Sequence, residues 1–281
     1  MFLLEILLAL ALLYLWRGDN PLHREEWFQR WVRKCGSWQW LSARPYRLGI
    51  LVVCVPVLLV ALVFMLIPNA LVLLFASLVL VYCLGRGELG EEILPYNAAY
   101  NDLDWDRATR SAARQGVDIE TIAISNWPKL HEQMLQAAAY HGFERLFAVI
   151  FWFVFLGPVG ALLYRLSHAF AHVQNTNIAH QWLWSMEWIP VRVFGASLAV
   201  TGNFVGCVNR WQKHLLSRTS TTGEFLLQSV LGALSVDDEL VASCDVTERE
   251  VAAIKRLYKR TLWFWLAVMA IWILFGPAEL F

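Results

Sequence analysis

Long apolar stretches alternate with charged ones along the chain, and this pattern predicts a helical membrane protein. Two uncharged runs, 48–67 and 70–84, are separated only by Pro68-Asn69, which predicts a tight helical hairpin. The last apolar run covers 261–275 and a short first run covers 2–16. The first run lacks a basic flank and a small-residue cleavage site, so we expect a retained membrane helix rather than a signal peptide.

Two middle segments, 146–164 and 189–208, carry features that a plain membrane anchor does not need. Gly157-Pro158 interrupts the first segment. The second begins Trp188-Ile-Pro-Val-Arg192, which places a proline and an arginine in its expected first turn. Broken backbone and polar groups are costly in a bilayer and persist mainly where they line a cavity or a site. Polar residues follow the first segment directly: Arg165, His168, His172, Asn175, Asn177 and His180.

The remaining polar regions, 85–142 and 209–260, predict cytoplasmic helices. Asp106 is the expected N-cap of a helix through Arg114, with Gly116 as its stop. A second helix is expected over 128–141. In the later region, Thr247-Glu-Arg-Glu250 is a capping box that predicts a helix leading into the last span.

Basic residues set the expected topology, because cytoplasmic loops are enriched in Lys and Arg. Residues 17–47 hold seven of them and repeat apolar residues along one helical face, which predicts an amphipathic cytoplasmic segment lying on the membrane. The N-terminus is then periplasmic. The middle segments must both cross, giving six spans, or both re-enter, giving four. The Gly-Pro break and Arg192, Gly202 and Asn203 favour broken or re-entrant segments. We expect one integral membrane domain over 1–281.

Composition narrows the class of protein further. The 281 residues are 58% hydrophobic and carry no net charge, which disfavours an ordinary soluble domain and a nucleic-acid partner. The lipid bilayer is the expected environment. Five cysteines without CxxC spacing support neither a disulfide framework nor a zinc site.

Two polar groupings could carry chemistry. His168 and His172 share a helix face at i, i+4, although hydrogen-bonded histidines explain them better than a metal site, because ligand pairs need a third donor. Glu144-Arg145, at the start of the broken segment, could bind a polar ligand or form an ion pair at the membrane boundary. Zincin, calcium-loop, P-loop and GxSxG motifs are incomplete or missing. No metal and no catalytic residue is therefore assigned.

Three segments follow one another in the middle of the chain: Phe151-Trp-Phe153, Gly157-Pro-Val-Gly-Ala-Leu-Leu-Tyr-Arg165 and Glu187-Trp-Ile-Pro-Val-Arg192. In these segments, and in its layout over the whole length, the chain resembles the AmpE/CobD-CbiB group of bacterial inner-membrane proteins. The synthase branch, CobD/CbiB, is implied to use ATP and Mg²⁺ to form an amide bond, with acidic motifs beside the first two segments. Here those slots read Ala139-Tyr-His-Gly-Phe-Glu-Arg145 and Leu166-Ser-His-Ala-Phe-Ala-His172, which lack the acidic pattern.

These departures match the AmpE branch better. The resemblance then implies a membrane regulator of inducible β-lactamase expression, linked to cell-wall recycling and not an enzyme, that binds a polar small molecule or a cytoplasmic protein partner. An ATP-dependent amide ligase with a rearranged site is the alternative. A membrane anchor that docks a soluble partner through 209–260 is the third reading. The resemblance implies these candidate ligand-binding residues: Glu144, Arg145, Arg165, His168, His172 and Arg192.

Overall fold

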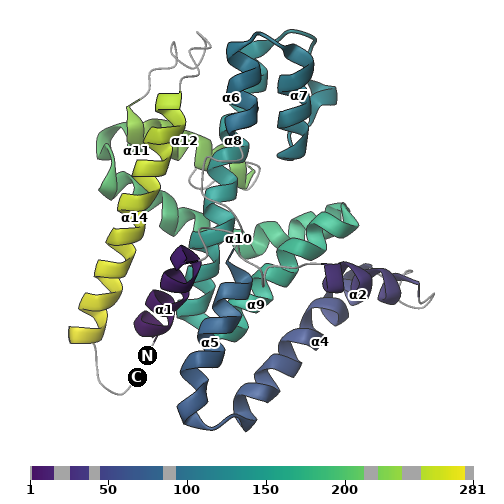
Figure 1. Cartoon of the computed structure of the whole chain (residues 1–281), viewed down its shortest axis with the longest axis vertical. Helices are drawn as coiled ribbons and strands as arrows, with labels where there is room; N and C mark the ends of the chain where they lie inside the picture. The colour runs from purple at the N-terminus through teal and green to yellow at the C-terminus, as the bar shows by residue number, and fades with distance from the viewer. Residues whose placement is uncertain are drawn as a thin grey trace. The chain divides into compact units, whose positions relative to one another are not determined.

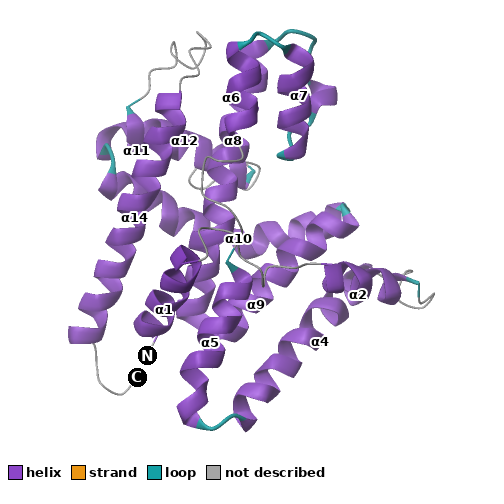
Figure 2. Ribbon diagram, in the orientation of Figure 1, coloured by secondary structure: helices purple, strands orange, loops and turns teal. Residues whose placement is uncertain are grey.

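Helices make up every regular element in the residues that the structure describes (Figure 2). The structure, a computed structural model, describes residues 2–15, 26–37, 45–84, 93–211, 221–235 and 248–275. The expected all-α fold class is confirmed. The described residues form two compact units, one within 1–86 and 145–190 and the other within 87–144 and 191–276. The expectation that they form one membrane domain stays a prediction.

The first unit is assembled around helix α9 (Ala148–Gln174). Helices α1 (Phe2–Leu15), α2 (Glu26–Gly36), α4 (Pro45–Leu66) and α5 (Asn69–Cys83) all contact it. The predicted α4–α5 hairpin is observed (Figure 1). Pro68 occupies the N-cap position of α5 without a side-chain cap hydrogen bond. Both helices of this hairpin are apolar through most of their length, and both contact α9.

Helix α9 breaks at Gly157, as the sequence predicts. Gly157 has φ 67° and ψ −161°, a backbone region open almost only to glycine. A Cβ on Gly160 would lie 2.5 Å from the carbonyl oxygen of Trp152. In a straight helix those residues would stand about 12 Å apart along the axis, since each residue rises about 1.5 Å. The two arms of α9 therefore fold back against each other.

The second unit contains α6 (Leu94–Asn101), α7 (Trp105–Arg114), α8 (Trp127–Gly142), α11 (Phe204–Trp211), α12 (Thr222–Leu234) and α14 (Glu248–Phe275). Helix α12 contacts α8, α11 and α14. Glycines let α11 and α12 approach closely, because a Cβ on Gly206 would lie 2.5 Å from the carbonyl oxygen of Gly232. Side chains of α6, α7 and α8 share an apolar cluster that includes Tyr96, Leu130 and Met134.

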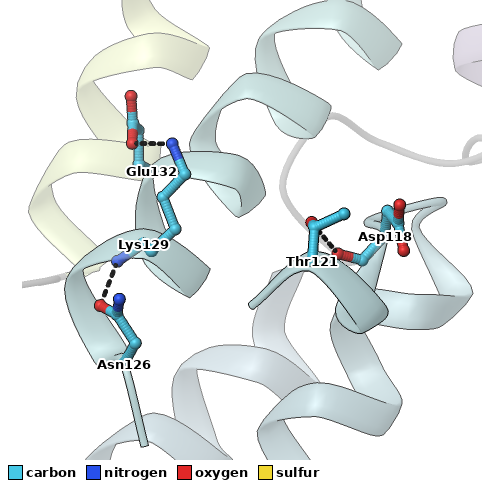
Figure 3. A network of polar contacts seen from close by, with 5 residues as sticks. All are labelled: Asp118, Thr121, Asn126, Lys129 and Glu132. Atoms are coloured by element: carbon cyan, nitrogen blue, oxygen red, sulfur yellow. Dashed lines mark hydrogen bonds and ion pairs between the residues drawn. The ribbon is translucent and has the colours of Figure 1, made fainter. Parts of the chain in front are cut away.

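Polar side chains cap helix starts in the part of this unit formed by α6, α7 and α8, which we call the α6–α8 lobe. Asn126 caps α8 by accepting from the Lys129 backbone N–H at 3.2 Å, and Thr121 donates to the Asp118 carbonyl at 3.0 Å (Figure 3). The predicted helix over 128–141 is observed as α8. The predicted Asp106 cap is wrong: Asp104 caps α7, because its extended backbone lets its carboxylate accept from the Arg107 N–H at 3.0 Å.

The segment expected at 189–208 begins earlier than predicted. Helix α10 covers Asn177–Thr201, so Pro190 and Arg192 lie in its middle and not in its first turn. The described chain leaves helical geometry instead at Gly202-Asn203, before α11. The expectation for the first turn is therefore wrong. The predicted capping box at 247–250 cannot be compared, because Thr247 lies outside the described residues.

Three helical stretches of the described chain are long and apolar enough to cross a membrane: 48–66, 127–174 and 251–275. Two shorter apolar helices, Phe2–Leu15 and Leu71–Cys83, accompany them. This is the helix content of a membrane protein. The described helices include both middle segments, and whether these cross the bilayer or re-enter it stays a prediction.

Candidate functional site

The second arm of α9 carries polar side chains into the interior of the first unit. Eight consecutive residues, 164–171, are all buried, so these two turns of α9 are buried on every side. The run contains Tyr164, Arg165, Ser167 and His168 among apolar residues. A helix buried all round is normally apolar all round, so four polar side chains here call for partners from neighbouring helices.

Helix α10 supplies two of those partners from its first half. The Tyr164 hydroxyl donates to Glu187 Oε1 at 3.0 Å, and Glu187 is only 2% exposed. The Trp182 indole donates to the Ser167 hydroxyl at 3.0 Å, while that hydroxyl donates to the Leu163 carbonyl at 2.7 Å. We refer to Tyr164, Arg165, Ser167, His168, Trp182 and Glu187 as the α9–α10 polar cluster.

Arg165 contributes a guanidinium to the cluster, and His168 contributes an aromatic ring. Arg165 is buried although it carries this guanidinium. The His168 ring lies with its centroid 4.5 Å from that of His172 and 6.3 Å from that of Tyr164. His172 is exposed, so the row of rings leads from the buried cluster to the surface of the unit.

Glu144 and Arg145 lie on an irregular turn that the sequence did not predict. Residues Phe143–Phe147 form a π-helical turn between α8 and α9. Such turns are rare and occur frequently at functional sites. Glu144 is buried, and its Oε1 lies 3.5 Å from His141 Nδ1. His141 Nε2 lies 3.1 Å from the carbonyl oxygen of Gln115, so the ring donates to that carbonyl when Nε2 carries the proton.

Arg192 belongs to the second unit, as Glu144 does. Its guanidinium lies over the Phe225 ring at 5.5 Å from the centroid, within cation–π range. Nearby on α10, Ser197 accepts from the Trp265 indole at 2.8 Å, and the Phe194 ring contacts Tyr258 and Trp265. This surrounding is mainly aromatic, which suits a structural role for the side chain at least as well as a ligand contact.

The structure thus brings part of the predicted set together. Arg165, His168 and His172 share the second arm of α9 in the first unit. Arg145 lies at the beginning of that unit's second segment, and Glu144 and Arg192 lie in the second unit. Sequence reasoning missed Tyr164 and Glu187 as site residues. A carboxylate inside a long apolar segment is a signal that could have identified Glu187, because such a charge is expensive to bury.

The donor set does not fit a magnesium nucleotide. Mg²⁺ takes oxygen ligands, and phosphoryl transfer needs such ions to neutralise charge. The first slot, Ala139–Arg145, offers one carboxylate, Glu144, which faces His141. The second slot, Leu166–His172, offers none. Within the described ranges, no three His, Cys, Asp or Glu side chains converge on one point.

Comparison with known proteins gives one family and one relative. Residues 1–277 match the family described as "Regulatory signalling modulator protein AmpE". The chain is also 26% identical over 176 residues to the cobalamin biosynthesis protein CobD of Stutzerimonas stutzeri (strain A1501). That match covers 57% of this chain and 56% of the relative, so it spans little more than half of each. No solved structure matches the chain.

Proposed function

The chain belongs to the AmpE family of regulatory signalling modulator proteins, and from that premise we propose that it modulates inducible β-lactamase expression by recognising a polar ligand or protein partner. The membrane regulatory role follows from the family and from the apolar helices. The proposed recognition element is the α9–α10 polar cluster together with His172. A link to cell-wall recycling is part of the same proposal.

The observation that supports this proposal best is the buried Tyr164–Glu187 hydrogen bond beside Arg165. A carboxylate, a guanidinium and a phenol in an apolar helix pair cost free energy that a membrane anchor need not spend. Arg165 suits an anionic group of a ligand, and Glu187 suits a donor such as an amine or hydroxyl. His172 provides the exposed edge through which such a molecule would reach them.

We place the protein in the bacterial inner membrane with a periplasmic N-terminus. The basic 17–47 stretch supports this orientation. The folded-back arms of α9 support a segment that enters from the cytoplasmic side and returns to it. His172 would then face the cytoplasm, where a regulatory partner or a recycled cell-wall fragment could meet it.

Complementation of a deletion strain tests the proposal. Wild-type protein should restore normal β-lactamase induction by a β-lactam, and Arg165→Gln and Glu187→Gln should not, at equal protein levels in the membrane. Lys129→Gln is the matched control, because Lys129 is exposed and forms only a surface ion pair. Induction that is unchanged in the deletion strain, or fully restored by both cluster variants, would contradict the proposal.

The similarity to CobD motivates a second candidate, an ATP-dependent amide ligase. Purified protein would then bind ATP with Mg²⁺, and Glu144→Ala would abolish that binding. The donor set argues against this candidate, because neither slot assembles a group of carboxylates. No nucleotide binding at millimolar ATP and Mg²⁺ would remove it.

A further inference from the structure

Helix α2 is fastened to the first unit in an unusual way. Pro56 lies inside α4 and lacks an N–H, so the carbonyl of Val52, four residues earlier, loses its helical partner. The Trp31 indole of α2 donates to this carbonyl at 3.2 Å. A second indole, Trp27, donates to the Tyr82 hydroxyl of α5 at 2.9 Å. Two tryptophans therefore hold α2 against the point where proline interrupts α4.

A groove of about 490 Å³ runs between this face of α2 and the Pro56 turn of α4. We refer to it as the α2 groove. Its α4 wall is apolar and includes Val55 and Leu59, which are 36% and 59% exposed. Its α2 wall carries Arg30 and Lys34, which lie one helical turn apart on the same face. The volume falls in the range of small-molecule sites.

We propose that the α2 groove binds an anionic phospholipid of the bilayer, with its phosphate on Arg30 and Lys34 and an acyl chain along α4. This inference stands apart from the proposed regulatory function and uses none of its residues. One wall of the groove is cationic and the other is apolar. An anionic phospholipid matches them with a negatively charged headgroup and apolar acyl chains. A phosphodiester carries one negative charge and two unesterified oxygens, which match two neighbouring cations.

The surroundings favour a lipid over other occupants. Helix α4 is a candidate span over 48–66, so its exposed side chains face acyl chains when it crosses a bilayer. Tryptophans and basic side chains are the residues that mark the level of lipid headgroups. A second groove of about 330 Å³ shares Trp27 and Pro56 and continues the apolar wall over α5 and α9 to Leu162. It offers an apolar surface along which part of the second acyl chain of the same lipid can lie.

Arg33 provides a matched control on the same helix. The Nε of Arg30 donates to the Glu26 carbonyl at 3.3 Å, and the Nε of Arg33 donates to the Gln29 carbonyl at the same distance. Both side chains are exposed, yet only Arg30 lines the groove. Arg30→Gln and Arg33→Gln remove the same charge from the same helix and differ only in that position.

Native mass spectrometry of the full chain in detergent, titrated with phosphatidylglycerol, tests the proposal. Each cation near a lipid headgroup contributes about 1 kcal/mol, which is about a fivefold change in affinity. We expect Arg30→Gln to weaken phosphatidylglycerol binding about fivefold and Arg30→Gln/Lys34→Gln about 25-fold, with Arg33→Gln changing it less than twofold. Phosphatidylethanolamine with the same chains should bind more weakly than phosphatidylglycerol to the wild-type protein.

Equal losses for Arg30→Gln and Arg33→Gln would overturn the proposal, because binding would then follow net charge alone. Equal affinity for the two lipids would overturn it as well. Photo-crosslinking with a diazirine in the acyl chain locates the site independently. Adducts on the peptide that contains Val55 and Leu59 are expected. Adducts confined to other peptides would overturn the placement of the lipid in the α2 groove.

Discussion

In the α6–α8 lobe, the helix-capping side chains of Asp104 and Asn126 lie in water, whereas in the α9–α10 polar cluster Tyr164 and Glu187 are hydrogen-bonded in mid-helix and buried. Lys129 and Glu132 of the lobe form an ion pair at 2.8 Å with both side chains well exposed (Figure 3). Tyr164 and Glu187 of the cluster form a hydrogen bond of similar length with both side chains buried. The two bonds look alike in geometry and differ in their surroundings.

The difference in surroundings decides what each bond does. Water competes for an exposed ion pair, which therefore contributes little to stability. A buried carboxylate has lost its water, so removing its partner leaves an expensive charge. The capping side chains of the lobe complete helices, whereas the hydrogen bonds of the cluster join α9 to α10 inside an apolar unit. Three substitutions test these roles, and a fourth tests the fold-back of α9.

The largest effect is expected for Glu187→Ala. It removes the acceptor of the Tyr164 hydroxyl and should lower the free energy of unfolding by about 2–3 kcal/mol, because a buried bond to a charged group is lost. Thermal unfolding in detergent, followed by circular dichroism, measures the change. Glu132→Ala is the control and should shift the midpoint very little. Equal shifts for the two variants would show that burial does not distinguish the two regions.

Gly160→Ala should destabilise the fold-back of α9 by about 1–3 kcal/mol. Its Cβ would meet the Trp152 carbonyl oxygen at 2.5 Å, and backbone cannot move away as a flexible side chain can. Gly36→Ala is the control, because a Cβ there meets nothing within 4 Å. The midpoint of thermal unfolding again reports the effect. A Gly160→Ala variant as stable as Gly36→Ala would mean that the two arms of α9 do not touch.

In the lobe, Asp104→Ala should cost about 1 kcal/mol, the usual value of a helix N-cap. Asp106→Ala should cost less than half of that, because Asp106 lies in the first turn and contributes only its charge near the helix N-terminus. Urea unfolding of the two variants side by side measures the difference. The reverse order would restore Asp106 as the cap.

The smallest effect is expected for Lys129→Ala, about 0.2–0.5 kcal/mol, since it removes one exposed i,i+3 ion pair. The loss should disappear in high salt, because salt screens charges at the surface. Unfolding midpoints in low and high salt show this directly. A loss that persists in high salt would place Lys129 in a tighter network than its exposure indicates.

The sequence predicts helices α7 and α8 and the outline of the membrane helices, because those depend on local patterns, but it does not predict α6. The Pro68 hairpin tip, helix α8 and the Gly157 break follow from residues next to one another in the chain. The Asp104 cap does not, because two aspartates only two residues apart are equally good cap formers and only backbone angles choose between them. The start of α10 is predicted too late because the prediction assigns Pro190 to its first turn. Proline is common in a first turn but is also tolerated in mid-helix between packed helices.

The site is harder to predict because it depends on contacts between helices and not on local patterns. His168 and His172 are four residues apart, and their spacing indicates a shared helix face; Arg165 precedes them on the same helix. Tyr164 and Glu187 meet only because α9 and α10 turn back on one another, and no local pattern encodes which side chains then face each other. The π-helical turn that carries Glu144 could not be predicted from the sequence either, because the composition of its residues does not differ from that of an ordinary helix.

The bond between Trp31 and the Val52 carbonyl has a consequence for how related sequences can change. The indole is useful at that place only while proline leaves the carbonyl open. A lineage that replaces Pro56 regains a helical N–H there and releases position 31 from selection, whereas one that loses Trp31 first carries an unsatisfied carbonyl until Pro56 also changes. Among descendants of this chain, the two positions should therefore be inherited as a pair, with proline disappearing before tryptophan.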